Sequence, residues 1–211
     1  MERLDITKRK MQKSKTESRC NMKSSRGKRS KLIMIDDFCD YNMKETIHMN
    51  FHNITHDDML NGSGLRVVLW VSGCNHKCEG CQNPQTWDCK SGIPFDAEAK
   101  EELFEELGKD YISGVTFSGG DPLHRNNLQK VVELVEEIKT IFKDKTVWIY
   151  TGYKWEDVKY MTQLWKNVDV LVDGEFEKDK LDINYHWGGS TNQRVIDVQQ
   201  TLANQHIILH E

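Results

Sequence analysis

Three of the six cysteines, Cys74, Cys78 and Cys81, fall within eight residues of one another in a C-x3-C-x2-C pattern. Thiolates this close together on one loop can hold three irons of a [4Fe–4S] cluster. A cubane cluster has four irons, so one iron is left without a cysteine and can bind a substrate. Gly73 and Gly80 allow the backbone to fold closely around such a cluster. The motif therefore predicts an iron–sulfur site that can do more than carry electrons.

Two other metal sites are compatible with the same cysteines. A structural zinc ion needs a fourth ligand, which His76 inside the loop or Cys89 beyond it can supply. A four-cysteine cluster of the ferredoxin type that uses Cys89 is also compatible. Otherwise Cys20, Cys39 and Cys89 are expected to be ordinary free thiols. Because the cysteines are clustered and no signal peptide is evident, we expect a reducing cytosol and a bound metal.

A second polar motif, Gly119-Gly120-Asp121-Pro122, stands where an apolar segment ends. Two glycines at the end of a strand allow a ligand to approach the backbone closely. Their unpaired carbonyl groups, with the Asp121 carboxylate nearby, could receive an ammonium group. Taken alone, the motif is more typical of a turn between a strand and a helix, in which Asp and Pro are common. Its occurrence together with the cysteine loop favours a binding site.

Both motifs follow predicted strands, in a chain whose pattern alternates between strands and helices. Apolar runs predict strands at 65–71, 115–117, 147–150, 168–172 and 195–198. Helices are predicted at 97–107, with Asp96 as N-cap, along 128–142, and at about 155–165. This alternation implies a parallel sheet covered by helices, with the active site at the ends of the strands. The units are too few to close a barrel, so we predict an α/β fold, specifically an open partial (β/α) barrel.

The charge is divided unevenly along the chain. Residues 1–35 contain 12 Lys+Arg and 3 Asp+Glu, a net charge of +9, and the remaining residues carry −13. Residues 1–42 are rich in Lys, Arg and Ser, which is typical of a disordered extension, and this leaves 43–211 as the domain. The extension could also be a nucleic-acid arm, although few aromatics interleave with its charges, and the acidic body argues against nucleic acid as a partner of the core. No apolar run reaches the roughly 18–20 residues of a membrane span. The clustered thiols and the lack of an evident signal peptide lead us to expect a cytoplasmic protein.

The two motifs together resemble those of the radical S-adenosylmethionine enzymes. The cysteine loop is that superfamily's cluster motif, and Gly119-Gly120-Asp121 is similar to its Gly-Gly-Glu methionine-amine site, with Asp in place of Glu. The residue before the last cysteine is often aromatic in the superfamily and is Gly80 here, so other groups must hold the adenine. Further stretches resemble one branch, the activating proteins of anaerobic ribonucleoside-triphosphate reductase, and the resemblance covers residues 49–198. These stretches are 61–66, 69–83, 118–124, 148–153, 170–174 and 190–194.

The resemblance implies an activating enzyme of the radical S-adenosylmethionine type. Cys74, Cys78 and Cys81 would hold a [4Fe–4S] cluster, whose fourth iron is chelated by the amino and carboxylate groups of S-adenosylmethionine. Transfer of one electron breaks the C5′–S bond and gives methionine and a 5′-deoxyadenosyl radical, which removes hydrogen from a glycine of the reductase. The implied partners are the glycyl-radical subunit of that reductase and an electron donor of the flavodoxin type.

The resemblance also implies a set of cofactor contacts. They are Gly80, Cys81, Gln82, Gly119, Gly120, Asp121 and Thr151. Thr151 is equally typical of a helix N-cap or a turn hydroxyl. Two other functions stay open: activation of a different glycyl-radical enzyme, such as a formate-lyase type, and a non-catalytic iron–sulfur or zinc-binding protein. The Thr-Gly-Tyr segment at 151–153 and the Ser-Thr-Asn-Gln-Arg segment at 190–194 favour the reductase branch.

Overall fold

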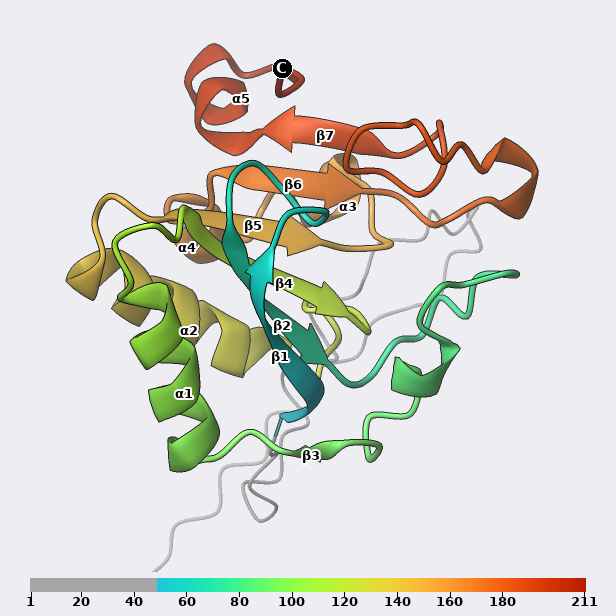
Figure 1. The fold of residues 1–211 in the computed structure, drawn as a ribbon. Coiled ribbons are helices and arrows are strands. Elements are labelled where there is room, and N and C mark those ends of the chain that lie inside the picture. Colours follow the sequence, from blue (N-terminus) through green and yellow to red (C-terminus); the bar gives the residue numbers. More distant parts are fainter. Residues whose placement is uncertain (1–48) are drawn as a thin grey trace, which may run out of the picture. The chain divides into compact units, whose positions relative to one another are not determined.

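A computed structural model describes residues 49–211, which form an α/β fold around one seven-stranded sheet (Figure 1). The strands are β1 (Asn50–Asp58), β2 (Arg66–Val71), β3 (Ile93–Pro94), β4 (Gly114–Gly119), β5 (Thr146–Tyr150), β6 (Val170–Asp173) and β7 (Arg194–Asp197). The helices are α1 (Ala97–Leu107), α2 (Leu128–Ile141), α3 (Trp155–Val158), α4 (Thr162–Trp165) and α5 (Val198–Asn204). The predicted extension 1–42 and the domain boundary at 43 lie outside the described residues.

The strand order in the sheet is β3-β1-β2-β4-β5-β6-β7. The central strands β2, β4, β5 and β6 are parallel, as predicted, whereas β1, β3 and β7 pair antiparallel to their neighbours. The prediction of a parallel sheet is therefore wrong for the flanking strands. Only seven residues connect β1 to β2, and a parallel pair needs a crossover of a dozen or more residues. The connection is therefore long enough only for an antiparallel pair.

The core lies between the sheet and helices α1 and α2, which gather on one side of the sheet in Figure 1. Strand β2 reads as a nearly continuous apolar run because both of its faces are buried. Helix α1 begins where the sequence predicts, because the Asp96 side chain accepts a hydrogen bond of 3.0 Å from the Ala99 N–H. Helix α2 buries the stripe Val131, Leu134, Val135 and Ile138 against the same core.

The helix predicted at 155–165 is broken into the short helices α3 and α4. In a continuous helix the Val158 carbonyl would accept from the N–H of Thr162. Here it accepts from the Met161 N–H and from the indole N–H of Trp165, at 3.0 and 2.8 Å. The buried Trp165 side chain thus takes a backbone acceptor and replaces one helical turn with a tighter one.

Arg66 fastens the amino ends of three parallel strands. Its side chain is fully buried, and its guanidinium donates to the Thr116 hydroxyl and to the Val115 and Thr146 carbonyls at 2.7–3.1 Å. Burial lowers the pKa of Arg66 to about 10, which leaves the group charged at neutral pH. Arg66 thus holds these three strands together at the end of the sheet away from the cysteine loop.

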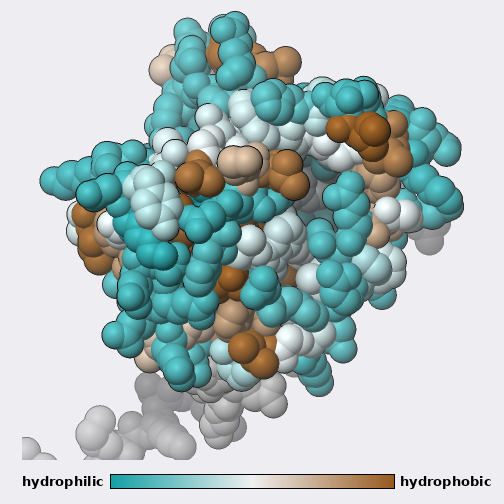
Figure 2. Space-filling view, in the orientation of Figure 1, coloured by the Kyte–Doolittle hydropathy of each residue, from teal (hydrophilic) through white to brown (hydrophobic). Residues whose placement is uncertain are grey.

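The carboxyl ends of the four parallel strands lie side by side at the same end of the strands, and a loop leaves each of them. The loops begin at Ser72 after β2, Gly120 after β4, Thr151 after β5 and Gly174 after β6. The face shown in Figure 2 is mostly hydrophilic, with apolar residues in small separate groups. Within residues 49–211, no helix has the length and apolar character needed to cross a membrane.

Candidate iron–sulfur site

The cysteine loop begins directly after β2 and is fixed at its start by backbone hydrogen bonds. The Gly73 N–H donates to the Thr86 carbonyl at 2.7 Å, and the Cys74 N–H donates to the Trp87 carbonyl at 3.0 Å. Gly73 has φ +100°, and a Cβ there would lie 2.9 Å from the Nδ1 atom of His124. A glycine is thus required both for the left-handed turn and for the close approach of the His124 ring.

The three loop thiols are free, partly exposed, and each faced by backbone N–H groups. Burial raises the pKa of Cys74 to about 11, and it also raises that of Cys78. Backbone amides act in the opposite direction and favour the thiolates that iron binds. These amides belong to His76 and Lys77 at Cys74 and to Phe176 at Cys78. The Asn83 N–H donates a hydrogen bond of 3.3 Å to the Cys81 sulfur. Amides directed at sulfur also tune iron–sulfur clusters, so this donor set fits one.

A single metal ion and a cluster place different demands on the loop cysteines. Within residues 49–211, no three histidine, cysteine or acidic side chains converge on a point that one ion could occupy. A tetrahedral zinc site requires such convergence at about 2.0–2.3 Å from the ion. A cubane cluster places each iron at a different corner, so its cysteine ligands need not meet at one point.

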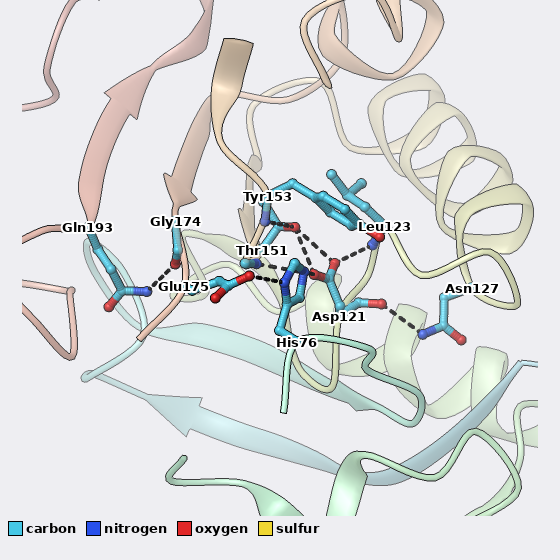
Figure 3. Close-up of polar contacts among 10 residues, drawn as sticks. His76, Asp121, Leu123, Asn127, Thr151, Tyr153, Gly174, Glu175 and Gln193 are labelled. Carbon is cyan, nitrogen blue, oxygen red and sulfur yellow. Dashed lines mark hydrogen bonds and ion pairs between the residues drawn. The ribbon is translucent and has the colours of Figure 1, made fainter. Parts of the chain in front are cut away.

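Asp121 lies at the centre of the polar contacts behind the cysteine loop (Figure 3). Its side chain is 2% exposed. One carboxylate oxygen accepts from the Leu123 N–H at 2.8 Å, and the other accepts from the Gly152 N–H at 3.1 Å and the His76 ring at 2.9 Å. The Thr151 hydroxyl lies 2.9 Å from both oxygens. Asp121 therefore links the cysteine loop to the ends of β4 and β5.

The His76 ring bridges two carboxylates. Its Nε2 lies 2.9 Å from Asp121, and its Nδ1 lies 2.9 Å from Glu175 in the loop after β6. Burial opposes protonation of the ring, but the hydrogen bonds and charges of Asp121 and Glu175 outweigh it and raise the pKa of His76. The edge of the ring also meets Tyr153 at a centroid distance of 4.6 Å. His76 thus ties the cysteine loop to two other strand ends.

The two glycines of the second motif pack against the start of the cysteine loop. Gly119 has φ +95°, and the N–H groups of Gly120 and Asp121 donate to the Val71 and Gly73 carbonyls at 2.7 and 2.8 Å. A Cβ at Gly120 would lie 2.7 Å from the Gly73 carbonyl oxygen. Among the described residues, no hydrogen bond uses the Gly120 carbonyl. The turn is therefore closed against the loop and keeps one acceptor free.

The remaining predicted residues lie in two places. Thr151 is buried and donates to Asp121, so it belongs to the same group of contacts as the cysteine loop. Gly80 lies at the far end of the loop, where a Cβ would stand 3.3 Å from the Lys178 side chain. Gln82 makes no side-chain hydrogen bond to any residue of the described range. The structure thus gathers Cys74, Asp121 and Thr151 around His76. Gly80 and Gln82 are exposed at the far end of the cysteine loop.

Three residues of this site were not predicted in these roles. His76 was considered only as a zinc ligand, although its place between two cysteines already puts it beside any bound cluster. Asn127 is buried and its side chain donates to the Ser72 and Asp121 carbonyls at 2.7 and 2.9 Å. Its position just before α2 in the sequence does not predict these two contacts. For Glu175 the only available signal was its position just after a predicted parallel strand.

Comparisons with known proteins show the family to which this chain is similar. A family model described as a 4Fe-4S single cluster domain matches residues 60–196. Three curated relatives are named anaerobic ribonucleoside-triphosphate reductase-activating protein. The relative from Enterobacteria phage T4 is 46% identical over 147 residues, which is 70% of this chain and 93% of the relative. The relative from Pasteurella multocida is 40% identical (69% and 95% covered), and that from Escherichia coli K12 is 39% identical (70% and 97% covered).

Proposed function

The chain belongs to the family of anaerobic ribonucleoside-triphosphate reductase-activating proteins, and from this premise we propose which of its residues carry the activity. The protein is an enzyme that activates the reductase, and it contains a 4Fe-4S single cluster domain. Because the chain spans more than nine-tenths of these relatives, the whole activity is expected to lie within the matched region.

We propose that Cys74, Cys78 and Cys81 are the cluster ligands and that S-adenosylmethionine is the second cofactor. When bound, the cluster supplies the electron that cleaves S-adenosylmethionine, and the resulting carbon radical takes a hydrogen atom from a glycine of the reductase. Backbone amides favour the thiolate forms of Cys74 and Cys78, and the Asn83 N–H donates to the Cys81 sulfur. Cys89 is left as a free thiol in this arrangement. The clustered free thiols favour a reducing, cytoplasmic setting.

The other predicted residues have supporting roles in this proposal. The free Gly120 carbonyl is suited to receive the amino group of S-adenosylmethionine, and Gly119 shapes the turn that presents it. Gly80, Cys81 and Gln82 lie along the rim where the adenosyl group would pass. Thr151 holds the Asp121 carboxylate in place through its hydroxyl hydrogen bond.

We also propose that the seven-stranded sheet is an open partial (β/α) barrel. Its end strands β3 and β7 do not pair with each other, so the sheet has two free edges. An open sheet leaves a side through which a glycine-bearing segment of another protein can reach the strand ends. This suits an enzyme whose substrate is a residue in a second protein.

One observation supports the proposal most strongly: the loop after β2 carries three free, partly exposed thiols, and its His76 contacts the buried Asp121 of the turn after β4. The experiment is anaerobic reconstitution of the full chain with iron and sulfide. We expect about four irons per chain, and 5′-deoxyadenosine on addition of S-adenosylmethionine and a reductant. Cluster-loaded protein that forms no 5′-deoxyadenosine would overturn the enzymatic proposal.

The choice of protein substrate is tested separately. The names of the relatives favour the reductase over another glycyl-radical enzyme. We expect the loaded protein to generate a radical on the reductase with a flavodoxin-type donor as one effective reductant. A radical that forms only on a different glycyl-radical enzyme would refute this choice and leave the cluster chemistry intact.

A further inference from the structure

We infer that Asp121 and His76 act together as one positioning device for the cysteine loop, and that Asp121 does not itself receive the amino group of S-adenosylmethionine. This inference rests on the proposed function for its cofactor and deepens it by assigning roles to residues around the site. Its structural basis is the set of contacts in Figure 3, which join the cysteine loop, the turn after β4 and the loops after β5 and β6.

The Asp121 carboxylate has no acceptor capacity left. An ionised carboxylate offers about four lone-pair sites. Two backbone N–H groups, the Thr151 hydroxyl and the His76 ring supply four donors. With 2% of its side chain exposed, water cannot take the place of a lost partner. An incoming ammonium would therefore have to displace one of these donors and leave it buried and unpaired, which is unfavourable.

His76 is the donor that belongs to the cysteine loop. It stands between Cys74 and Cys78, and its two ring nitrogens contact carboxylates from two other strand ends. The loop segment between these cysteines is thus fastened at its middle from both sides. The position of the first two sulfurs relative to the turn after β4 depends on this ring.

The surroundings of the ring are shaped to hold it. A Cβ at Gly152 would lie 2.5–2.7 Å from three atoms of the His76 ring, so a glycine is needed for the ring to enter. The rings of His76 and Tyr153, the residue after Gly152, also meet in a T-shaped contact. A side chain that lay loosely on the surface would not require a glycine at the position it contacts. The structure therefore assigns His76 a fixed place, with Asp121 as its anchor.

The first experiment uses the full chain without its cluster and measures hydrogen exchange of the amides in residues 73–83. We expect His76→Ala and Asp121→Asn each to raise exchange in this loop, and the double variant to raise it no further than His76→Ala alone, because the link to Asp121 is already absent in that variant. His76→Gln, whose amide can still reach Asp121, recovers part of the protection. Unchanged exchange in His76→Ala, or fully additive effects, would overturn the inference.

A matched control comes from the same two loops. Glu79 and Lys178 form an ion pair of 3.0 Å, but their side chains are 84% and 59% exposed. Exposed pairs contribute little to stability. Glu79→Gln is therefore expected to leave exchange in the cysteine loop unchanged, although it removes a contact between the same segments as His76 and Glu175.

The second experiment measures dissociation constants on cluster-loaded protein for S-adenosylmethionine and for its analogue without the amino group. We expect both His76→Ala and Asp121→Asn to weaken S-adenosylmethionine binding while keeping the preference over the analogue within about threefold of wild type. If Asp121 bound the amine directly, Asp121→Asn alone would reduce that preference by about tenfold or more, the scale of a charge-assisted hydrogen bond. That result would overturn the inference.

The two experiments separate this inference from the proposed function. A wild-type protein that binds no S-adenosylmethionine would contradict the proposed function, whereas the exchange result would still report on the His76–Asp121 link. Conversely, normal cofactor cleavage with no coupling between the two variants would leave the proposed function in place and remove the positioning role.

Discussion

Gly120→Ala separates two reasons for a glycine in the turn after β4. Either a side chain would collide with a bound cofactor, or it would collide with the protein itself. A Cβ at this position would lie 2.7 Å from the Gly73 carbonyl oxygen, 2.9 Å from the Val71 carbonyl oxygen and 3.0 Å from the Gly73 nitrogen. All three are backbone atoms that cannot rotate away, so the collision with the protein is present without any cofactor.

The expected loss of stability follows from these contacts. Overpacking of this kind costs about 1–3 kcal/mol, and the lower entropy of the unfolded alanine chain offsets roughly 0.5 kcal/mol of it. The net destabilisation is therefore about 1.5 kcal/mol. For a domain of this size, each kcal/mol lowers the Tm by about 2–4 °C, which gives a decrease of about 3–6 °C.

The assay is thermal unfolding of the full chain without its cluster, under reducing conditions. The control is Gly108→Ala at the end of α1, where φ is −70° and the nearest atom to a new Cβ is 3.3 Å away. We expect this control to match wild type or to unfold slightly higher. A Gly120→Ala protein that unfolds at the wild-type temperature and fails only to bind S-adenosylmethionine would refute the reasoning.

Three further predictions concern the ligands, a helix cap and pH. Serine in place of any one loop cysteine is expected to abolish stable cluster loading, measured as iron per chain, whereas Cys89→Ser keeps it. Asp96→Ala is expected to cost about 1 kcal/mol in denaturant unfolding, because the first turn of α1 loses its cap; an unchanged midpoint would contradict this. Hydrogen bonds from Arg194 lower the pKa of Glu156 to about 2, so its stabilising effect is full above the unfolded value of 4.5 and is lost as pH falls towards 2. Because the side chain is 52% exposed, the loss is only about 0.5–1 kcal/mol, and Glu156→Gln should remove it from unfolding curves recorded across that range.

The parts of the fold that could be predicted are those in which local sequence and burial agree. Strand β2 is buried on both faces and its sequence is continuously apolar, and Asp96 stands directly before the amphipathic helix that it caps. Strand β1 was missed because its nine residues alternate irregularly between polar and apolar, with only Phe51 and Ile54 buried. The break between α3 and α4 depends on the Trp165 indole finding a backbone carbonyl, which no local pattern encodes.

The same division applies to the site. The cysteine spacing and the paired glycines are local, so the cluster loop and the turn after β4 could be read directly from the sequence. The contact between His76 and Glu175 joins residues 99 positions apart, and it exists only because parallel strands bring their ends to one edge. The sequence therefore predicts which residues carry the chemistry better than it predicts which residues hold them in place.

The most direct test of the central claim is electron paramagnetic resonance of the reductase after anaerobic incubation with this protein. The incubation contains cluster-loaded protein, S-adenosylmethionine and a reductant. We expect a glycyl radical on the reductase with wild-type protein, together with 5′-deoxyadenosine, and neither product when Cys78 is replaced by serine. A fully loaded wild-type protein that forms neither the radical nor 5′-deoxyadenosine would refute the proposed function.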